Sequence, residues 1–389
     1  MKIALVAPDD ITHYIYRKGL IISLIESGHE VCLISKSGEH VSQLENLGAR
    51  HIHVNLGRFI NPLHDLRLII EFYQIFRKEK FDIIHNFTIK PNTYGTLMAS
   101  VAGCKRIFNT VEGLGFMVYD PDEKKILSKT LKIALKYLYK ISSRLSEKTW
   151  FLNTDDIHYF LENKLINPQK VLLVKSTGIN LDEWKLSSAE KVASLKQKMG
   201  FHPDDLLIVM VTRALNNKGI HEFLYAMEHL TAKYEKAKFV LAGGAEEDLK
   251  RGVPASLLQE KANKYPFYWL GHQNNIIDTF AISDIVVLPS YYREGVPRCL
   301  MEGMALKKPL VTTDNVGCRE TVDEGVNGFL VPIKDGKSLT EKIERLIQDP
   351  DLRYKMGLAG YEKAKREFDE KIIVASLLQN LYQFNDKTC

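Results

Sequence analysis

Short runs of β-branched and apolar residues alternate with longer amphipathic segments along this chain, and no other feature restricts its possible folds as strongly. The first series of apolar runs covers residues 2–7, 29–35, 51–54, 81–87, 106–111 and 148–153. Unbroken apolar runs separated by helical segments are typical of a parallel sheet with helices on both faces. Gly28, just before the second run, suits the left-handed position that ends a helix. The first part of the chain is therefore predicted to be a doubly wound α/β domain.

A second series of the same kind follows a polar, Lys-rich stretch at residues 187–199. Its apolar runs cover residues 206–211, 238–243, 267–271, 284–290, 308–313 and 327–332. The sequence therefore predicts two Rossmann-like α/β domains in tandem, an N-terminal domain over residues 1–170 and a C-terminal domain over residues 171–365. In such sheets ligands bind beyond the carboxyl ends of the strands, so we expect the functional residues in the loops that follow the apolar runs.

Composition excludes several classes of protein. The net charge of +5, from 53 basic and 48 acidic residues, is mild and dispersed, which argues against a nucleic acid partner. The five cysteines are scattered without a CxxC spacing, which predicts reduced thiols and no zinc site. The N-terminal residues read as a first strand rather than a signal peptide, and no run reaches the roughly 18 apolar residues of a membrane-spanning helix. We expect a cytoplasmic protein.

The loop after the apolar run at residues 284–290 contains two glutamates in a directed arrangement. Glu294 and Gly295 stand in the loop, Pro297 suits the first position of a helix, and Glu302 lies on that helix. The free amides of a helix start can face an anion, and Gly295 lets a ligand approach closely. A carboxylate binds sugar or ribose hydroxyls but not phosphate, so these groups must have separate roles.

Two cations follow the run at residues 206–211. Arg213 and Lys218 are expected at the carboxyl end of that strand, where two positive charges can neutralise a diphosphate leaving group. Taken alone, an Arg and a Lys are usually solvated, and glutamates near a helix start are usually surface acids that complement the helix dipole. The conjunction of cations and acids in the strand-end loops favours a donor-binding site.

These residues resemble a known family. Arg213, Lys218, the E-x7-E spacing of Glu294 and Glu302, the glycine pair that begins at Gly243, and the segments 270–297 and 327–332 resemble the retaining GT-B glycosyltransferases known as glycosyl transferases group 1. The resemblance is dense over residues 206–350. It implies a GT-B fold, with two doubly wound Rossmann-like domains facing a central cleft. It also implies that the C-terminal helical segment, about residues 366–389, packs back on the N-terminal domain.

The resemblance also implies roles for individual residues. Arg213 and Lys218 hold the donor phosphates, Glu294 contacts the transferred sugar, and Glu302 binds the ribose. The remaining donor-binding candidates are Gly243, His272, Gly295 and Val296. Catalysis is assigned to Glu294, Arg213 and Lys218, with reaction at the donor's front face and the leaving phosphate assisting deprotonation of the acceptor. The donor implied is a UDP-sugar carrying a hexose or N-acetylhexosamine, with no metal and no other cofactor.

The first loop, residues 7–19, lacks the G-x-G-x-x-G fingerprint of a nicotinamide-binding domain. It also lacks the glycine pair that many family members carry there. His13 in this loop is either a site residue or an ordinary side chain at the start of a helix. Two segments that read D-x-D, at residues 120–122 and 349–351, place proline between the acids, as turns and helix starts do. We interpret both as structural and expect no metal.

Two further segments, residues 85–99 and 109–116, resemble a subgroup that acts on lipid-linked oligosaccharide precursors of bacterial surface glycans and glycoproteins. They supply the acceptor-side candidates Lys90, Asn92, Glu112 and Gly113, together with His13. Glu112 stands where many relatives place a histidine. It either binds sugar hydroxyls or is a structural residue beside the turn at Gly113.

The segment 124–144 carries a stripe of basic residues with apolar flanks. The stripe consists of Lys125, Lys129, Lys132, Lys136, Lys140 and Arg144. Such a helix can lie on an anionic membrane surface, each nearby cation contributing on the order of 1 kcal/mol. A solvated helix face packed on its own sheet is the alternative. The lipid-linked acceptor that the resemblance implies favours a protein held peripherally on the inner face of the cytoplasmic membrane.

The sequence thus predicts a retaining glycosyltransferase. It would move a hexose or N-acetylhexosamine from a UDP-sugar to a glycan acceptor, a polyprenyl-diphosphate-linked sugar. A GT-B-fold sugar-nucleotide epimerase needs acid and base groups but no acceptor, and the E-x7-E loop and the basic stripe disfavour it. A nucleotide-binding or dehydrogenase module is disfavoured by the missing glycine fingerprint.

Overall fold

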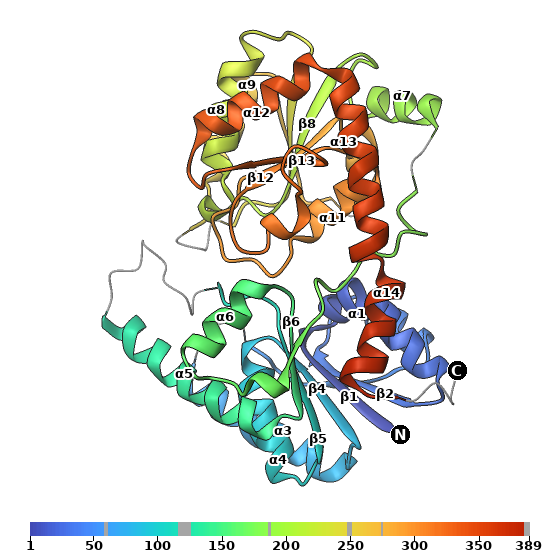
Figure 1. Ribbon diagram of the computed structural model, residues 1–389, viewed down its shortest axis with the longest axis vertical. Coiled ribbons are helices and arrows are strands. Elements are labelled where there is room, and N and C mark those ends of the chain that lie inside the picture. The colour runs from blue at the N-terminus through green and yellow to red at the C-terminus, as the bar shows by residue number, and fades with distance from the viewer. Residues whose placement is uncertain (58–60, 116–125, 186–187, 247–250, 274, 385–389) are drawn as a thin grey trace. The chain divides into compact units, whose positions relative to one another are not determined.

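The computed structural model describes residues 1–57, 61–115, 126–185, 188–246, 251–273 and 275–384 (Figure 1). The chain forms two compact units. Unit 1 consists of Met1–Gly178 and Glu370–Cys389, and unit 2 consists of Ile179–Asp369. The chain therefore passes between the units twice, at residues 178–179 and again at residues 369–370.

Unit 1 is built on a parallel sheet that has, in the described residues, seven strands in the order β3-β2-β1-β4-β5-β6-β7. The strands are β1 (Lys2–Asp9), β2 (Glu30–Lys36), β3 (Arg50–His53), β4 (Ile83–Phe87), β5 (Arg106–Val111), β6 (Lys148–Phe151) and β7 (Val171–Leu173). Its central strands are buried along almost their whole length, as their apolar runs predict. The strand order reverses between β1 and β4.

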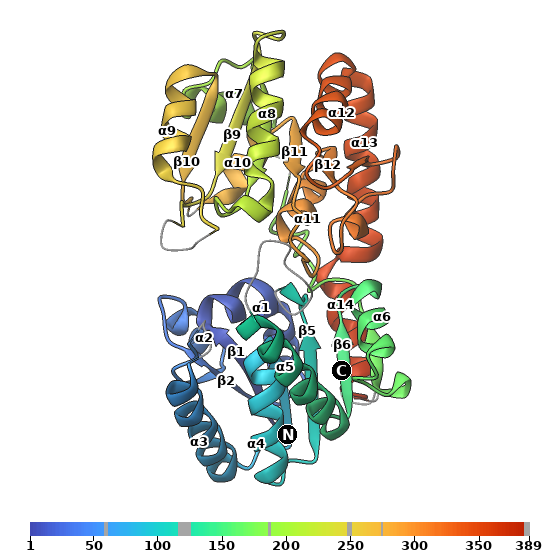
Figure 2. The same ribbon diagram turned by 90° about the vertical axis from the view of Figure 1, so that its left-hand side faces the viewer.

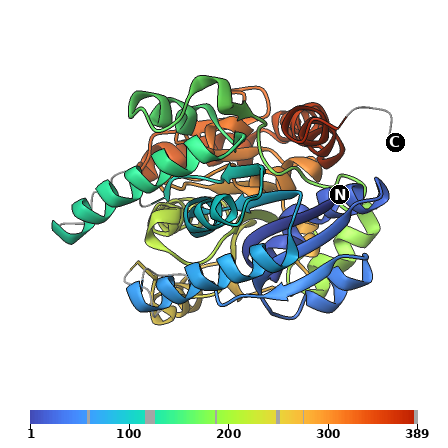
Figure 3. The same cartoon turned by 90° about the horizontal axis from the view of Figure 1, so that it is seen from below.

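Helices cover both faces of this sheet. They are α1 (Asp10–Glu26), α2 (Val41–Asn46), α3 (Pro62–Glu79), α4 (Thr96–Val101), α5 (Ile126–Leu145), α6 (Thr154–Glu162) and α14 (Glu370–Ser376). The Asp9 side chain caps α1 by accepting a hydrogen bond from the Thr12 amide, and Gly28 follows the helix with a φ of 78°. The helix α4 contacts both α3 and α5 and lies between them (Figures 2 and 3). Among the described helices, none is both long and apolar enough to cross a membrane.

Unit 2 repeats the plan with a parallel sheet of, in its described residues, six strands in the order β10-β9-β8-β11-β12-β13. The strands are β8 (Leu206–Val211), β9 (Ala237–Ala242), β10 (Phe267–Gly271), β11 (Ile285–Leu288), β12 (Leu310–Thr313) and β13 (Gly328–Val331). The helices are α7 (Ala189–Lys198), α8 (Ile220–Thr231), α9 (Ala255–Lys264), α10 (Ile276–Ile282), α11 (Arg298–Ala305), α12 (Gly336–Gln348) and α13 (Pro350–Lys363). The strand order reverses between β8 and β11, which makes the loops after these two strands the expected place for a ligand.

Local signals place two helix starts in unit 2. Pro297 immediately precedes α11 rather than occupying its first position, because the helix begins at Arg298. Asp349 caps α13 by accepting a hydrogen bond from the Leu352 amide at 2.9 Å, with Pro350 as the first helical residue. This confirms the structural interpretation of residues 349–351, whereas residues 120–122 lie outside the described residues.

Candidate functional site

The loops that follow β8 and β11 bring together two of the predicted donor residues. The Lys218 ammonium forms an ion pair with Glu294 Oε1. The Ser290 hydroxyl donates a hydrogen bond to the same carboxylate oxygen at 2.9 Å. Both charged side chains are largely buried, with 16% and 13% exposure. Burial opposes the charge on Lys218, but the Glu294 carboxylate more than compensates and raises the pKa of Lys218.

Backbone contacts fix these two loops against each other. The amides of Tyr291 and Tyr292 donate hydrogen bonds to the Asn217 carbonyl at 3.0 and 3.1 Å. Gly219 has a φ of 82°, and a Cβ at this position would lie 2.2 Å from the Pro289 carbonyl oxygen. Only glycine permits this approach, so the loop that carries Lys218 is held directly against the end of β11.

The other predicted residues of the donor site occupy neighbouring loops. Arg213 is about half exposed, and its Nη1 lies 3.3 Å from Glu246 Oε1. The Gly243 amide donates a hydrogen bond to the Gly271 carbonyl at 2.7 Å, which joins the loops after β9 and β10. His272 is exposed in the second of these loops. Four adjacent strands of the sheet therefore end in the loops that carry the donor candidates.

Glu302 lies on α11, which begins just after the Glu294 loop. Its side chain is almost completely buried, and the Arg298 guanidinium Nε donates a hydrogen bond to it at 2.9 Å. Burial raises the pKa of Glu302, while Arg298 opposes that rise. Sequence reasoning missed Arg298, although its spacing of four residues from Glu302 on a helix is a recognisable signal. Val296 is half-buried and packs against the core of unit 2.

The end of β12 and the loop that follows it form hydrogen bonds to the Glu294 loop. Asn315 Nδ2 donates hydrogen bonds to the carbonyls of Ser290 at 3.3 Å and Tyr292 at 2.8 Å, and the Thr313 hydroxyl also donates to the Ser290 carbonyl. Gly317 has a φ of 78°, and a Cβ there would lie 2.2 Å from the Gly295 carbonyl oxygen. No sequence pattern indicates this support.

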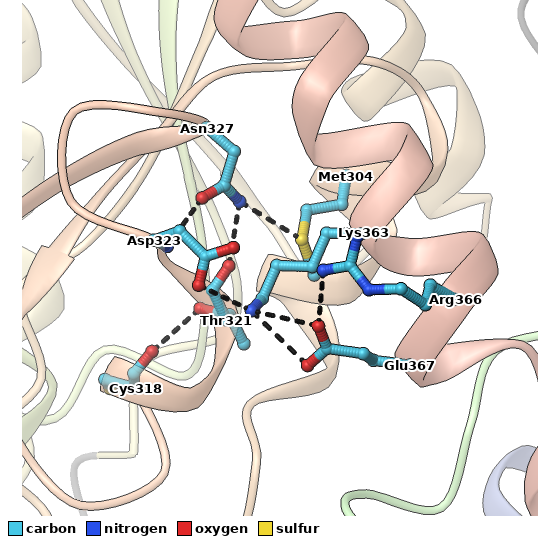
Figure 4. Close-up of polar contacts among 8 residues, drawn as sticks. All are labelled: Met304, Cys318, Thr321, Asp323, Asn327, Lys363, Arg366 and Glu367. Atoms are coloured by element: carbon cyan, nitrogen blue, oxygen red, sulfur yellow. Dashed lines mark hydrogen bonds and ion pairs between the residues drawn. The ribbon is translucent and has the colours of Figure 1, made fainter.

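A polar network ties the continuation of this supporting loop to α13 (Figure 4). Lys363 Nζ lies 2.8 Å from Asp323 Oδ1, and the Glu367 carboxylate also faces it. The Asn327 side chain accepts a hydrogen bond from the Asp323 amide at 2.7 Å and donates one to the Thr321 carbonyl at 2.9 Å. The Thr321 hydroxyl in turn donates to the Cys318 carbonyl, next to Gly317. The segment that holds the Glu294 loop is therefore anchored at both ends.

Replacing Gly317 with alanine is expected to destabilise unit 2, because the added Cβ would overlap the Gly295 carbonyl. The added Cβ incurs both the backbone strain of a positive φ, about 1 kcal/mol, and an overlap with the Gly295 carbonyl, about 1–3 kcal/mol more. Gly325→Ala is the matched control, because Gly325 has a φ of 74° and no heavy atom within 4 Å of its added Cβ. Urea unfolding should show the larger loss for Gly317→Ala, and equal losses would contradict the supporting role of this loop.

The acceptor-side candidates lie in unit 1. Glu112 follows β5 and forms an ion pair with Arg17 on α1. Asn92 is fully buried and hydrogen-bonds both the carbonyl and the amide of Thr110, at 2.6 and 3.3 Å. Lys90 lies 2.6 Å from Asp65 on α3. Asn92 and Lys90 therefore have partners within the protein.

His13 and Gly113 are the two further acceptor-side candidates. His13 is completely buried near the start of α1, and burial holds its pKa well below the ordinary value. Gly113 follows Glu112 with a φ of 117°, which glycine adopts readily. In the described residues, no group of three or more His, Cys, Asp or Glu side chains is arranged to hold a metal ion.

Comparison with known proteins identifies relatives for both units. Residues 192–363 match the family model described as glycosyl transferases group 1, and residues 2–145 match that of the glycosyl transferase 4-like family. The N,N'-diacetylbacillosaminyl-diphospho-undecaprenol alpha-1,3-N-acetylgalactosaminyltransferase of Campylobacter jejuni is 29% identical over 97% of this chain and 98% of its own length. The UDP-Gal:alpha-D-GlcNAc-diphosphoundecaprenol alpha-1,3-galactosyltransferase of Escherichia coli is 25% identical over 82% of this chain and 80% of its own.

Solved structures share the fold over nearly the whole chain. A glycosyltransferase from Rickettsia africae matches with a TM-score of 0.75 at 22% identity, covering 97% of both chains. HepE of Anabaena in complex with UDP and glucose matches with a TM-score of 0.76 at 18% identity, covering 99% of this chain and 100% of its own. The predicted GT-B class, with two Rossmann-like domains, is confirmed.

Proposed function

Because residues 192–363 match the glycosyl transferases group 1 family and this chain is a glycosyltransferase, we propose that it moves a hexose or N-acetylhexosamine from a UDP-sugar to a sugar on polyprenyl diphosphate, retaining the anomeric configuration. The observation that carries the donor side is the Lys218–Glu294 ion pair at the point where the strand order of unit 2 reverses. The relatives from C. jejuni and E. coli, which are transferases for sugars linked to undecaprenyl diphosphate, support the lipid-linked acceptor.

The proposed reaction uses the two charges of this pair differently. Cleavage of the glycosyl–phosphate bond builds negative charge on the departing oxygen, and the Lys218 ammonium, with Arg213, stabilises it. Glu294 holds Lys218 in place and accepts hydrogen bonds from hydroxyls of the transferred sugar. The amides of Gly295 and Val296 approach the diphosphate. The leaving phosphate accepts the proton of the acceptor hydroxyl as the new glycosidic bond forms.

The remaining donor contacts follow from burial and position. Glu302 accepts hydrogen bonds from the ribose hydroxyls, with Arg298 holding its carboxylate. The loops of Gly243 and His272 lie by the base. The reaction is proposed to need neither a metal nor another cofactor, so transfer measured in the presence of EDTA should equal transfer without it. Loss of transfer on chelation, restored by a divalent cation, would overturn this part of the proposal.

The experiment that tests the proposal supplies UDP-sugars together with a polyprenyl-diphosphate-linked sugar and identifies the products by mass spectrometry. Transfer predicts free UDP and an acceptor that is heavier by one sugar. The same donors without an acceptor test for an epimerase, which would convert the UDP-sugar to an isomer. Conversion of the donor alone, with the acceptor unchanged, would contradict a transferase.

We further propose that unit 1 binds an anionic membrane surface through α5. This helix has no acidic residue over Ile126–Leu145. Its exposed face carries apolar side chains at every fourth position, namely Ile133, Tyr137, Ile141 and Leu145. Exposed apolar side chains flanked by cations suit a lipid headgroup surface.

The basic stripe on α5 divides into two parts. Lys129 and Arg144 are exposed, and Lys132 and Lys140 are half-buried. Lys136 donates a hydrogen bond to Asn163 at 2.8 Å, so it is turned toward the protein, and Lys125 lies outside the described residues. A second helix of unit 1, α3, adds exposed Leu63, Leu66, Ile70 and Tyr73, with exposed Arg67 and Arg77 beside them. Both helices therefore present apolar and basic side chains to solvent.

Replacing Ile133 and Tyr137 with aspartate should release the protein from vesicles of phosphatidylethanolamine and phosphatidylglycerol. The change removes two exposed apolar contacts and adds two charges that the anionic lipids repel. Flotation of the protein with vesicles at about 0.1 M salt measures the effect, since screening weakens it at higher salt. Tyr354→Asp is the control, because Tyr354 is an exposed tyrosine of unit 2. A double variant that floats as the wild type does would remove α5 from the membrane contact.

A further inference from the structure

A buried ion pair lies at the carboxyl edge of the unit 1 sheet. Arg17 on α1 is 2% exposed, and its Nη2 contacts Oε1 of Glu112, which immediately follows β5. Arg17 Nη1 also donates a hydrogen bond to the Thr12 carbonyl at 3.0 Å. The centre of its guanidinium group lies 3.7 Å from the centroid of the Phe87 ring. These contacts fix the guanidinium, and the guanidinium fixes the carboxylate.

The two partners differ in their access to solvent. The Glu112 side chain is 20% exposed, whereas Arg17 is enclosed. Glu112 is therefore the partner of the pair that a ligand can reach, and it stands at the end of a central strand, where parallel α/β sheets bind their ligands. An ionised carboxylate only accepts hydrogen bonds, and the hydroxyls of a sugar donate them.

Arg17 and Glu112 are the charged groups of this region. The titratable groups that face them are His13 and Tyr16 on α1, His85 on β4, Tyr139 on α5, and Tyr382 in the C-terminal segment. Burial, followed by repulsion from Arg17, lowers the pKa of His13 and of His85 well below its ordinary value, so both are neutral at pH 7. Burial raises the pKa of Tyr139 and of Tyr382, which are neutral as well. Burial also raises the pKa of Glu112, and Arg17 opposes that rise.

We propose that Arg17 is a positioning residue for transfer, which holds the Glu112 carboxylate in place as an anionic hydrogen-bond acceptor for a hydroxyl of the acceptor sugar. This inference rests on the proposed glycosyltransferase reaction and deepens its acceptor side. Arg17 itself touches no substrate. It acts through the charge and the orientation of Glu112.

The pH dependence of kcat/KM for the acceptor tests this role. Without Arg17 the buried carboxyl group keeps its desolvation penalty and loses its counter-charge, so the pKa of Glu112 rises further. Arg17→Met should therefore move the acid limb of the profile to higher pH by about one unit or more, because a neighbouring opposite charge is worth about 1–3 units. On the acid side the rate falls about tenfold for each unit of that shift, and at high pH the variant approaches the wild type. Arg17→Lys, which keeps a cation, should return the acid limb most of the way to its wild-type pH.

Two controls distinguish a positioning role of Arg17 from a nonspecific loss of structure. Arg106→Met removes a comparable arginine, which pairs with Glu147 at 3.0 Å and lies 5.3 Å from the Phe108 ring centroid, but at the opposite end of β5. Its acid limb should not move. Calorimetric binding of UDP, a probe of the donor site, should be the same for wild type and the Arg17 variants.

If Arg17→Met alone fails to fold, a double variant that removes both charges still tests the role of Arg17. Glu112→Gln should lose the acid limb, and the double variant Arg17→Met/Glu112→Gln should give the same profile as Glu112→Gln, because Arg17 acts only through Glu112. An unmoved acid limb in Arg17→Met, or a further rate loss in the double variant, would overturn the inference. A wild-type protein that binds UDP but transfers no sugar would instead overturn the proposed function, before any variant is compared.

Discussion

Glu294→Gln should lower the rate of sugar transfer by about 10²–10³-fold, the usual cost of removing one preorganised polar group from a transition-state site. The amide keeps the size of the side chain but removes the charge that pairs with the Lys218 ammonium. It also removes the anionic acceptor of the Ser290 hydroxyl. The transferred sugar would lose its anionic contact, and Lys218 would lose the group that orients it. The effect is measured as kcat at saturating donor and acceptor.

A second Lys–Glu pair of unit 2 provides the control for this substitution. Glu344 on α12 contacts Lys233 and accepts a hydrogen bond from the Tyr234 hydroxyl at 2.9 Å, away from the loops after β8 and β11. Glu344→Gln removes a charge of the same kind and should leave transfer unchanged. Circular dichroism should show both variants folded. If Glu294→Gln transfers sugar at the wild-type rate, Glu294 has no part in the reaction.

Lys218→Met should reduce kcat by a similar factor and weaken binding of UDP. The ammonium is the cation best placed to stabilise the leaving diphosphate, because it stands at the strand end and is held by Glu294. Its raised pKa keeps it charged at neutral pH. The stability that the raised pKa of Lys218 contributes is fully present below the pKa of an unfolded lysine, about 10.4, and it is lost as the pH rises through the folded-state pKa of Lys218. Removing one partner of a buried pair typically costs about 3–5 kcal/mol, so the free energy of unfolding should fall as well.

Binding and stability need to be distinguished in this variant. Lys261→Met is the matched control, because Lys261 on α9 pairs with Glu228 in the same unit and is more exposed. It should leave kcat and UDP affinity unchanged. Urea unfolding reports the loss of stability in Lys218→Met, and calorimetry with UDP at a temperature where the variant is folded reports binding. Unchanged UDP affinity together with an unchanged kcat would exclude Lys218 from the donor site.

The fold could be predicted from the sequence because each core strand of a parallel sheet is an apolar run, and each crossover is an amphipathic segment. The strand β7 was missed, since its three residues are half-exposed and present no buried run. The start of α11 was misplaced by one residue, because Pro297 suits both the position before a helix and its first turn. Local chemistry therefore predicts which elements exist better than it predicts their ends.

The candidate site could be predicted only in part. Lys218 and Glu294 were recognised from their strand-end loops, but they are 76 residues apart, and no sequence pattern shows that they pair. The support from Gly317 went unrecognised, because a glycine in a loop carries no chemistry until its neighbours are known. The pairing of Arg17 with Glu112, 95 residues away, was hidden for the same reason. Contacts between distant loops depend on the folded sheet, whereas residue types at strand ends do not.

A single transfer assay shows both whether the anomeric configuration is retained and whether the sugar reaches a lipid-linked acceptor. The purified protein is incubated with a UDP-hexose or a UDP-N-acetylhexosamine and a polyprenyl-diphosphate-linked sugar, and the product is analysed by mass spectrometry and NMR. The expected products are free UDP and an acceptor heavier by one sugar, with a new glycosidic bond that has the anomeric configuration of the donor. An inverted bond would contradict retention. An unchanged acceptor with every such donor would contradict the transfer itself.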